Sequence, residues 1–197
     1  YNESMPAEQI NISNQAITDN GYNKLMNLTV SDDYVITQYF SDYSMKILQN
    51  PEIAYEMLND EYKTAKFENY EEFQQYVSDR RQEIESASIQ GYTVEEYDGT
   101  KQYVCVDQNN KYYIFNQNTL YSYDAILDTY TIDLPEFLDR YNNANVSEKA
   151  GFNVQKILDS LNDRDYKYAY GKLDETFKQN NFKTLKDFED YWNKNLY

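Results

Sequence analysis

The side chains that could do chemistry in this chain are carboxylates and tyrosine phenols, because the sequence holds no histidine. This excludes histidine acids and bases, Ser-His and Cys-His nucleophile pairs, and histidine metal sites. A carboxylate beside a phenol could still abstract a proton while the phenol stabilises the oxyanion. No pair of carboxylates has a spacing that singles it out, so we predict solvated strand faces and no catalytic, cofactor-binding or metal-ligating residues. The carboxylates considered are Glu95, Glu96, Asp98, Asp107, Asp124, Asp128 and Asp133.

Two further motifs carry weak chemical signals. Cys105 lies between valines in a predicted strand, where an apolar setting raises the pKa of a thiol, so we expect a small core residue. It is the one cysteine of the sequence and therefore forms no internal disulfide. The run from Asp107 to Asn110 resembles the start of a calcium loop, but the loop's glycine is missing and Asn118 stands where its glutamate should be. A tight turn is therefore expected there.

The composition is that of an acidic globular protein, with 41% hydrophobic and 26% charged residues. Acidic residues outnumber basic ones by 34 to 18, and the net charge of −16 predicts no nucleic-acid partner and no direct adsorption to anionic lipid. No apolar run reaches the ~20 residues needed to cross a bilayer. Because the sequence begins at Tyr1 rather than Met, we expect that an upstream anchor or signal has been trimmed.

Helical periodicity dominates the residues before position 88. A first helix is expected after Ser31 or Asp32, either of which can cap it. Asn50 followed by a proline predicts the start of a second helix. Asn69 lies three residues before Glu72, a capping-box arrangement that begins a third helix. The apolar stripe of the first helix consists of Val35, Ile36, Tyr39, Phe40, Tyr43 and Ile47.

After Ser88 the apolar period changes from 3.6 to 2, which predicts an antiparallel meander. Asp98-Gly99 is a two-residue hairpin signal that places Glu96 opposite Lys101. Asn109-Asn110 suits the next tight turn because asparagine tolerates positive φ. That turn places Val104 opposite Phe115 and Val106 opposite Tyr113 on one face, with Tyr103, Cys105, Tyr112 and Ile114 on the other. The expected strands are Ile89–Tyr97, Lys101–Asp107, one after Asn110 and a longer one over Leu120–Ile132, followed by a short helix over Glu136–Asn142.

One segment recurs without a gap 115 residues further along the chain. Residues 54–77 and 169–192 share seven of 24 paired positions, and most of their other apolar positions are alike. A repeat of this kind indicates one packing unit used twice. The pattern is Ala54-Tyr55-x-x-Leu58, Tyr62-Lys63, Phe67, Phe73 and Tyr76 in the first copy, and Ala169-Tyr170-x-x-Leu173, Phe177-Lys178, Phe182, Phe188 and Tyr191 in the second.

The second copy is predicted to hold three helices and no strands. Ser147 can cap the first of them, and Asp165 begins the second. Thr184 and Asp187 repeat the capping arrangement at the start of the third. The apolar residues of the first of these helices are Phe152, Ile157, Leu158 and Leu161.

A set of helices followed by a four-stranded meander resembles the nuclear-transport-factor-2-like (cystatin-like) domain. The residues that show the resemblance are Ala54–Tyr62 and Phe67–Val77, together with their repeat at Tyr170–Phe177 and Phe182–Phe188. The runs are similar to those of Gram-positive envelope proteins with an N-terminal membrane anchor and tandem domains outside the cell. The resemblance covers residues 31–197. It implies a cone-shaped fold, and it transfers no catalytic residue because the matched positions serve packing and capping.

The predicted fold is therefore α+β: three N-terminal helices packed on a curved four-stranded antiparallel sheet, followed by the helical half of a second copy. The expected divisions are an extended arm over residues 1–30, a first domain over 31–141 and the incomplete copy over 142–197. Each aromatic ring of that copy could contribute roughly 4–6 kcal/mol if buried. We therefore expect the chain to continue past Tyr197, or these helices to pack on the first domain or on another chain. The rings are Phe177, Phe182, Phe188, Tyr191 and Trp192.

Three functions compete on this evidence. The leading hypothesis is a non-enzymatic interaction or structural module on the extracellular face of a bacterium, which needs no cofactor and binds protein or itself through the second-copy helices. The alternative is a small-molecule-binding or isomerase- or hydratase-type cone, like ketosteroid isomerase, with an aspartate beside a tyrosine. A third hypothesis is recognition of peptide or glycan by the 23 tyrosines, which would need an exposed cluster of three or more.

Overall fold

A computed structural model of the chain describes residues 30–97 and 99–196, and the structural statements below concern these residues. The extended arm expected over residues 1–30 lies outside them, apart from Val30. The chain divides into two units after Thr37. The described part of the first unit is residues 30–37, where the hydroxyl of Thr37 donates to the carbonyl of Asp33 (2.7 Å) inside the opening turns of a helix.

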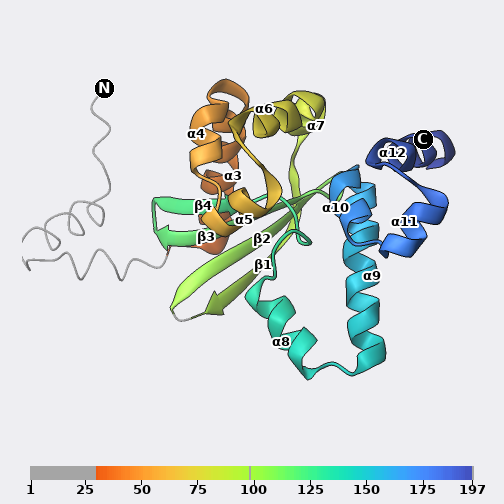
Figure 1. The fold of residues 1–197 in the computed structure, drawn as a ribbon. Helices are drawn as coiled ribbons and strands as arrows, with labels where there is room; N and C mark the ends of the chain where they lie inside the picture. The colour runs from red at the N-terminus through yellow and green to blue at the C-terminus, as the bar shows by residue number, and fades with distance from the viewer. Residues whose placement is uncertain (1–29, 98, 197) are drawn as a thin grey trace, which may run out of the picture. The chain divides into compact units, whose positions relative to one another are not determined.

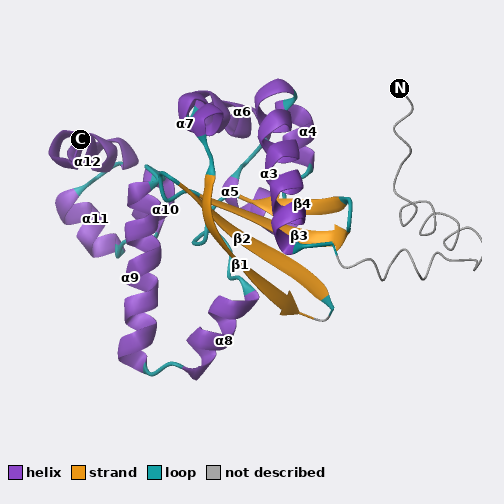
Figure 2. Cartoon of the chain, turned by 180° about the vertical axis from the view of Figure 1, so that it is seen from behind, coloured by secondary structure: helices purple, strands orange, loops and turns teal. Residues whose placement is uncertain are grey.

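Helices come first, four strands follow, and helices return after the sheet, so the described residues form an α+β structure. Both views place α6 and α7 above the strands and α8 below them (Figures 1 and 2). The elements are α3 (Asp32–Gln49), α4 (Pro51–Glu56), α5 (Asp60–Lys66), α6 (Tyr70–Asp79), α7 (Arg81–Ser86), β1 (Ile89–Tyr97), β2 (Thr100–Asp107), β3 (Tyr112–Thr119), β4 (Ser122–Ile126), α8 (Pro135–Asn143), α9 (Val146–Asn162), α10 (Tyr166–Gly171), α11 (Glu175–Asn181) and α12 (Leu185–Leu196).

The four strands form one antiparallel sheet in the order β1-β2-β3-β4, as the period-two pattern predicted. The first hairpin is confirmed, with Tyr97 paired with Thr100 and Glu96 paired with Lys101. Gly99 has a φ of 76°, a left-handed conformation that glycine adopts without a Cβ clash. Asp98, the other turn residue, lies outside the described residues.

The second hairpin corrects the sequence-based register. The expected pairing of Val104 with Phe115 and of Val106 with Tyr113 is wrong by one residue, because Phe115 pairs instead with Tyr103. A shift of one residue moves every side chain to the opposite face of a strand. The face of the sheet that the rings of α3 cover therefore carries Tyr103, Cys105, Tyr113, Phe115, Tyr123 and Ala125. Ile114 and Ile126 are buried on the opposite face.

Loop length explains the shift. The backbone N–H of Asp107 donates to the carbonyl of Lys111 (2.9 Å), so three residues rather than two separate the strands. The side chain of Asp107 accepts hydrogen bonds from the N–H groups of Asn109 (2.7 Å) and Lys111 (2.9 Å). Asn110 has a φ of 59°, as the last residue of a three-residue hairpin loop requires.

Replacing Asn110 with valine tests this loop directly. We expect Asn110→Val to lower the free energy of unfolding by roughly 1–2 kcal/mol, because a β-branched residue is strained at positive φ. Asn109→Val is the matched control and should be close to neutral. The two-residue turn expected from the sequence would require positive φ at both positions, so equal losses in urea unfolding would support that register instead.

The fourth strand is shorter than the predicted span Leu120–Ile132, because it ends at Ile126. Asp128 ends the extended backbone: its Oδ1 accepts hydrogen bonds from the N–H groups of Tyr130 (3.1 Å) and Thr131 (2.8 Å). A side chain that binds backbone two and three residues ahead favours a turn over a strand ladder. This turn brings Asp128 to the candidate site described below.

The edge of β4 is paired with the linker between α4 and α5. The N–H of Ala125 donates to the carbonyl of Met57 (2.9 Å), and the N–H of Asn59 donates to the carbonyl of Ala125 (2.9 Å). This pairing satisfies an edge that would otherwise offer free backbone groups to another strand.

Aromatic side chains from α3 fill the space over the buried face of the sheet. Tyr43 and Phe115 are fully buried, and their ring centroids lie 6.2 Å apart. The ring of Tyr39 lies 6.0 Å from those of both Tyr103 and Phe115. The tyrosine rings in this region thus pack in the core, and their hydroxyls form hydrogen bonds at the edge of the core. For example, Tyr123 donates to the carbonyl of Tyr39 (3.2 Å).

Helix caps agree with the sequence at some positions and not at others. Asn69 caps α6 as expected by accepting from the N–H of Glu72 (3.0 Å). The side chain of Glu72 binds the N–H of Glu68 rather than that of Asn69, so the capping box there is incomplete. Asn50 makes no side-chain cap, although the proline after it begins α4. The expected Ser147 cap is wrong, because Asn145 caps α9 two residues earlier in a complete capping box with Glu148.

Helix bounds recur at the offset of the sequence repeat. Helices α4, α5 and α6 begin at Pro51, Asp60 and Tyr70, and helices α10, α11 and α12 begin 115 residues later. Ring packing recurs as well. The centroids of Phe67 and Phe73 lie 5.2 Å apart at 85° between planes, and the later pair Phe182–Phe188 shows 5.2 Å and 83°.

The later helices share a small core of their own. Its buried members are Leu161, Tyr166, Ala169 and Phe188. Phe182 and Trp192 pack against this core and are partly buried. The aromatic rings of these helices are therefore partly buried without a sheet of their own. Phe177 and Tyr191 remain about half exposed, at 47% and 49%. Helices α9 and α10 supply the cover that no strand provides within the described residues.

Candidate functional site

The carboxylates considered from the sequence are dispersed rather than gathered. Glu95 and Glu96 lie in β1, the latter opposite Lys101. Asp133 follows β4 and forms an ion pair with Lys156. Glu96 and Asp133 are exposed, as expected. The expectation of solvated strand faces is wrong for Asp107 and Asp128, which are buried.

Asp124 belongs to a polar row across the middle of the sheet. The amide of Gln102 donates to Asn116 (2.7 Å), and the amide of Asn116 donates to Asp124 (2.7 Å). Burial raises the pKa of the Asp124 carboxyl, and hydrogen bonds from Asn116 and Asn59 oppose that rise. The partners of this carboxylate are amides rather than phenols, so the row does not form an acid–base pair with a tyrosine.

Cys105 is a core residue, as the sequence predicted. Its side chain is fully buried, and burial raises the pKa of the thiol to about 12. A thiol with that pKa remains protonated at neutral pH, so it is neither a nucleophile nor a metal ligand there.

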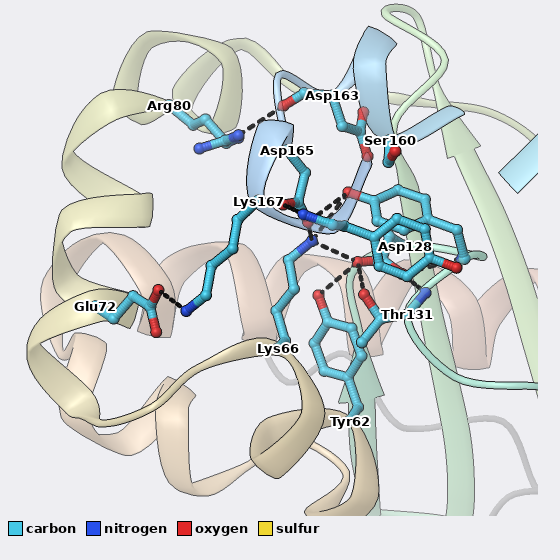
Figure 3. A network of polar contacts seen from close by, with 12 residues as sticks. Tyr62, Lys66, Glu72, Arg80, Asp128, Thr131, Ser160, Asp163, Asp165 and Lys167 are labelled. Atoms are coloured by element: carbon cyan, nitrogen blue, oxygen red, sulfur yellow. Dashed lines mark hydrogen bonds and ion pairs between the residues drawn. The ribbon is translucent and has the colours of Figure 1, made fainter. Parts of the chain in front are cut away.

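The densest polar cluster in the described structure surrounds Lys66 (Figure 3). Its Nζ lies 2.9 Å from Oδ2 of Asp128 and 2.9 Å from the hydroxyl of Tyr130, and it also forms an ion pair with Asp165. The side chains of Lys66, Asp128 and Asp165 are only 9%, 2% and 14% exposed. Burial at this level is rare for charged groups unless they are paired. We call these four residues, with Tyr62 and Thr131, the Lys66 cluster.

Asp128 is the most heavily bonded member of the Lys66 cluster. Besides Lys66, its Oδ2 accepts from the hydroxyls of Thr131 (2.7 Å) and Tyr62 (3.2 Å), while its Oδ1 accepts the two backbone bonds that end β4. One ammonium faces two carboxylates here, and the hydroxyl donors stabilise the additional negative charge.

Three distant elements build this cluster. Lys66 is the last residue of α5, Asp128 lies in the turn after β4, and Asp165 is the N-cap of α10, where it accepts from the N–H of Tyr168 (3.0 Å). Sequence reasoning identified Asp165 as a cap and Asp128 as one of many carboxylates, and it missed Lys66. A lysine in the last turn of a helix carries no signal of burial, because that position is also favourable for an exposed cation.

The electrostatics of the cluster hold each group in one protonation state. Burial alone would lower the pKa of the Lys66 ammonium, but the charges of Asp128 and Asp165 outweigh it and raise that pKa above its usual value. Burial, and then the charge of Asp128, raise the phenol pKa values of Tyr62 and Tyr130 well above the ordinary range. Lys66 is therefore a cation and both tyrosines are neutral at physiological pH.

Further polar contacts run beside the Lys66 cluster between α6, the β2–β3 loop and the turn before α10. Arg80 donates to the carbonyl of Asp163 (2.7 Å), and Lys111 forms an ion pair with the Asp163 carboxylate. Lys167 lies 2.7 Å from Glu68 and 3.0 Å from Glu72. Opposite charges thus join the β2–β3 loop to the turn before α10, and the start of α6 to α10.

A pocket of about 450 Å³ opens beside these contacts. Its lining includes three carboxylates and three cations, so it presents no net charge of one sign to a ligand. Several of these charges already have partners inside the chain. The charged lining residues are Asp79, Arg80, Glu83, Lys111, Asp163 and Arg164.

Exposed tyrosines do not form a binding surface on the sheet. Tyr92 and Tyr112 are 40% and 37% exposed, but their strand partners Cys105 and Val106 are adjacent residues. Adjacent residues of a strand point to opposite faces, so these two tyrosines lie on opposite sides of the sheet. The described strands therefore lack the exposed cluster that peptide or glycan recognition would need.

No protein-family model matches this chain, and neither a curated protein nor a solved structure matches it significantly. Within residues 30–97 and 99–196, no helix is both long enough and apolar enough to cross a membrane. The same residues contain no group of three or more His, Cys, Asp or Glu side chains arranged to hold a metal ion.

Proposed function

We propose that this chain is a non-enzymatic structural or interaction module. In this proposal, residues 31–141 form a nuclear-transport-factor-2-like domain whose sheet curves into a cone, and residues 142–197 form the helical half of a second copy. The α+β order, the antiparallel meander and the recurrence of helix bounds at an offset of 115 residues support it.

The observation that carries the proposal is that side chains of the chain itself fill the interior. The face of the sheet that would line a ligand cavity is filled by rings: Tyr43, Tyr103 and Phe115 are each no more than 1% exposed. A binding site for a small molecule needs a concave space with a few convergent polar groups. The buried charges of the chain instead bond to one another in the Lys66 cluster, where they connect α5, the turn after β4 and α10.

The proposed setting is the extracellular face of a bacterial cell. The net charge of −16 supports a protein that stays off anionic lipid and nucleic acid. Partners would be proteins, or a second copy, bound through the second-copy helices. Protease added to intact cells should digest the protein, and protection until lysis would contradict this setting.

One observation favours the alternative of a small-molecule-binding or isomerase-type cone. The buried hydroxyl of Tyr123 donates to Oδ2 of Asp42 (2.7 Å), which is the combination of groups that such enzymes use. Burial first, and then the hydrogen bond to Asp42, raise the pKa of the Tyr123 phenol. However, Asp42 also forms an ion pair with Lys46 (2.7 Å) at a partly exposed position, so the negative charge of its carboxylate already has a cationic partner.

An NMR titration separates the two functions. Steroid ketones and small enolisable ketones, added to the labelled chain, should leave the amide signals of Tyr103, Phe115 and Tyr123 unchanged, because buried rings occupy this face of the sheet. Saturable shifts confined to these residues, lost in Tyr123→Phe, would instead establish an interior ligand site and overturn the non-enzymatic proposal.

A further inference from the structure

The later helices pack on the earlier ones through two unlike surfaces (Figure 3). One surface is the start of α10, where Asp165 forms an ion pair with Lys66 and Lys167 lies 2.7 Å from Glu68. The other is the surface of α5 and α6 that receives it, which carries Lys66 and Glu68 and includes Tyr76 beside the start of α10. We call the first kind of surface the corner and the second kind the face. Because the two kinds differ, the earlier helices keep an unused corner and the later helices keep an unused face.

The unused corner is the start of α4, which lies 115 residues before the start of α10. Asn50 and Glu52 hold the positions of Asp165 and Lys167. Both residues are exposed, and the next residue, Ile53, is 50% exposed. This corner is therefore open to solvent in the described structure.

The unused face lies on α11, α12 and the turn between them. Asn181, Lys183 and Tyr191 follow the three face residues of the earlier helices by 115 positions, and all three are exposed, Tyr191 at 49%. The ring of Tyr191 continues into those of Phe182 and Phe177, with successive centroids 5.3 and 6.2 Å apart. The later helices thus present an open face with apolar rings and a cation.

The unused corner and the unused face have complementary charges. In the contact that is formed within the chain, a lysine of the corner binds a glutamate of the face. At the same positions the unused corner carries Glu52 and the unused face carries Lys183, so the signs are exchanged but remain opposite. Asn50 and Asn181 replace the buried ion pair with two amides, and each amide can donate to and accept from the other.

The later helices do not repel an acidic corner. Residues 142–197 contain nine acidic and nine basic side chains, so the net charge of −16 comes from residues 1–141. Near the unused face, the carboxylate of Asp187 accepts from the N–H of Thr184 (3.0 Å) at the start of α12, where a negative charge is favourable. In both views α6 and α7 lie between α4 and α12 (Figures 1 and 2). The corner of one molecule can therefore reach the face of another molecule but not its own.

From this correspondence we propose that the chain associates with further copies of itself head to tail. The start of α4 of one molecule docks on the α11–α12 face of the next, and Glu52 pairs with Lys183. A dimer formed in this way keeps one free corner and one free face, so further molecules add to it. The inference names the partner of the proposed interaction module and rests on that proposed function.

Sedimentation velocity of the 197-residue chain over a range of concentrations tests this docking. We expect the average mass to rise with concentration past that of a dimer. Glu52→Lys and Lys183→Glu each place like charges in the contact, so each variant alone should stay monomeric at concentrations where the parent chain associates. An equal mixture of the two variants should associate again, because the altered corner of one then meets the altered face of the other. Both positions are exposed, and far-UV circular dichroism would verify that the variants fold like the parent.

Lys186→Glu is the matched control, because it changes the charge by the same amount at a lysine that pairs with Asp190 (3.1 Å) outside the face. This variant should associate like the parent chain. A parent chain that stays monomeric, a mixture no heavier than its separate variants, or a dimer that neither variant weakens would each overturn the inference. The proposed function is tested separately, since it fails if ketones shift the interior signals in the NMR titration.

Discussion

Lys66→Met is expected to lower the free energy of unfolding by about 3–5 kcal/mol, although methionine nearly matches the length and volume of the lysine stem. Removing one partner of a buried ion pair leaves an uncompensated charge, and that desolvation cost is the main loss. Here the charges left behind are Asp128, at 2% exposure, and Asp165, at 14%. Urea unfolding followed by far-UV circular dichroism would measure the change.

Lys186→Met is the matched control for this prediction. Lys186 pairs with Asp190 (3.1 Å) on α12, but both side chains are more than 60% exposed. Exposed pairs contribute at most about 1 kcal/mol, so this variant should unfold almost like the parent protein. Adding Asp128→Asn to Lys66→Met should restore part of the lost stability, because the amide needs no countercharge. Equal losses for Lys66→Met and Lys186→Met would mean that Lys66 is not buried among charges.

Alkaline unfolding is the second large effect that we expect. Burial raises the phenol pKa values of Tyr43, Tyr62, Tyr113 and Tyr130 above the ordinary value. The unfolded chain therefore releases these protons first, at its pKa of ~10. Stability from these groups is fully present below that pH and is lost as the pH rises toward the folded pKa values.

The size of this effect follows from linkage. Each phenol that ionises only on unfolding lowers the free energy of unfolding by about 1.4 kcal/mol per pH unit, so four of them give about 5.5 kcal/mol per unit. Lys66 adds a change of the same sign, because its folded pKa is also raised. A domain with an ordinary stability of about 5–15 kcal/mol should thus unfold within a few pH units above ~10.

Tyrosinate absorbance and far-UV circular dichroism, recorded together against pH, would measure alkaline unfolding. The two signals should change in one cooperative step. Tyr113→Phe should reduce the dependence on pH by about 1.4 kcal/mol per unit, since it removes one of the four phenols. Gradual ionisation of most tyrosines near pH 10 with the secondary structure intact would show that the rings are not buried.

Local signals in the sequence were sufficient for the starts of several helices and for the first hairpin. They did not give the number of helices, because the expected second helix is divided into α4 and α5, and α7 follows α6 as a separate helix. The cap at Asn69 and the turn at Gly99 depend on neighbours within four residues, and both occur as expected. The register of β2 and β3 was missed because the side chain of Asp107 lengthens the loop by one residue. A dipeptide signal does not report that choice, because two-residue and three-residue turns both accept asparagine at positive φ.

The Lys66 cluster could not be predicted because its members are brought together by tertiary packing. Lys66 is separated from Asp128 by 62 residues and from Asp165 by 99. Nothing in the spacing or type of these residues distinguishes them from the other charges of an acidic, helix-rich chain. The Tyr123–Asp42 bond, across 81 residues, was hidden for the same reason.

The most direct test of a structural rather than catalytic Lys66 cluster is an NMR titration of the Lys66 side-chain nitrogen. We predict an ammonium that stays protonated up to the pH at which the fold is lost, with a pKa above the ordinary value of a lysine. A Lys66 pKa below that of an exposed lysine would contradict the account, because a neutral buried amine is a nucleophile rather than a paired cation.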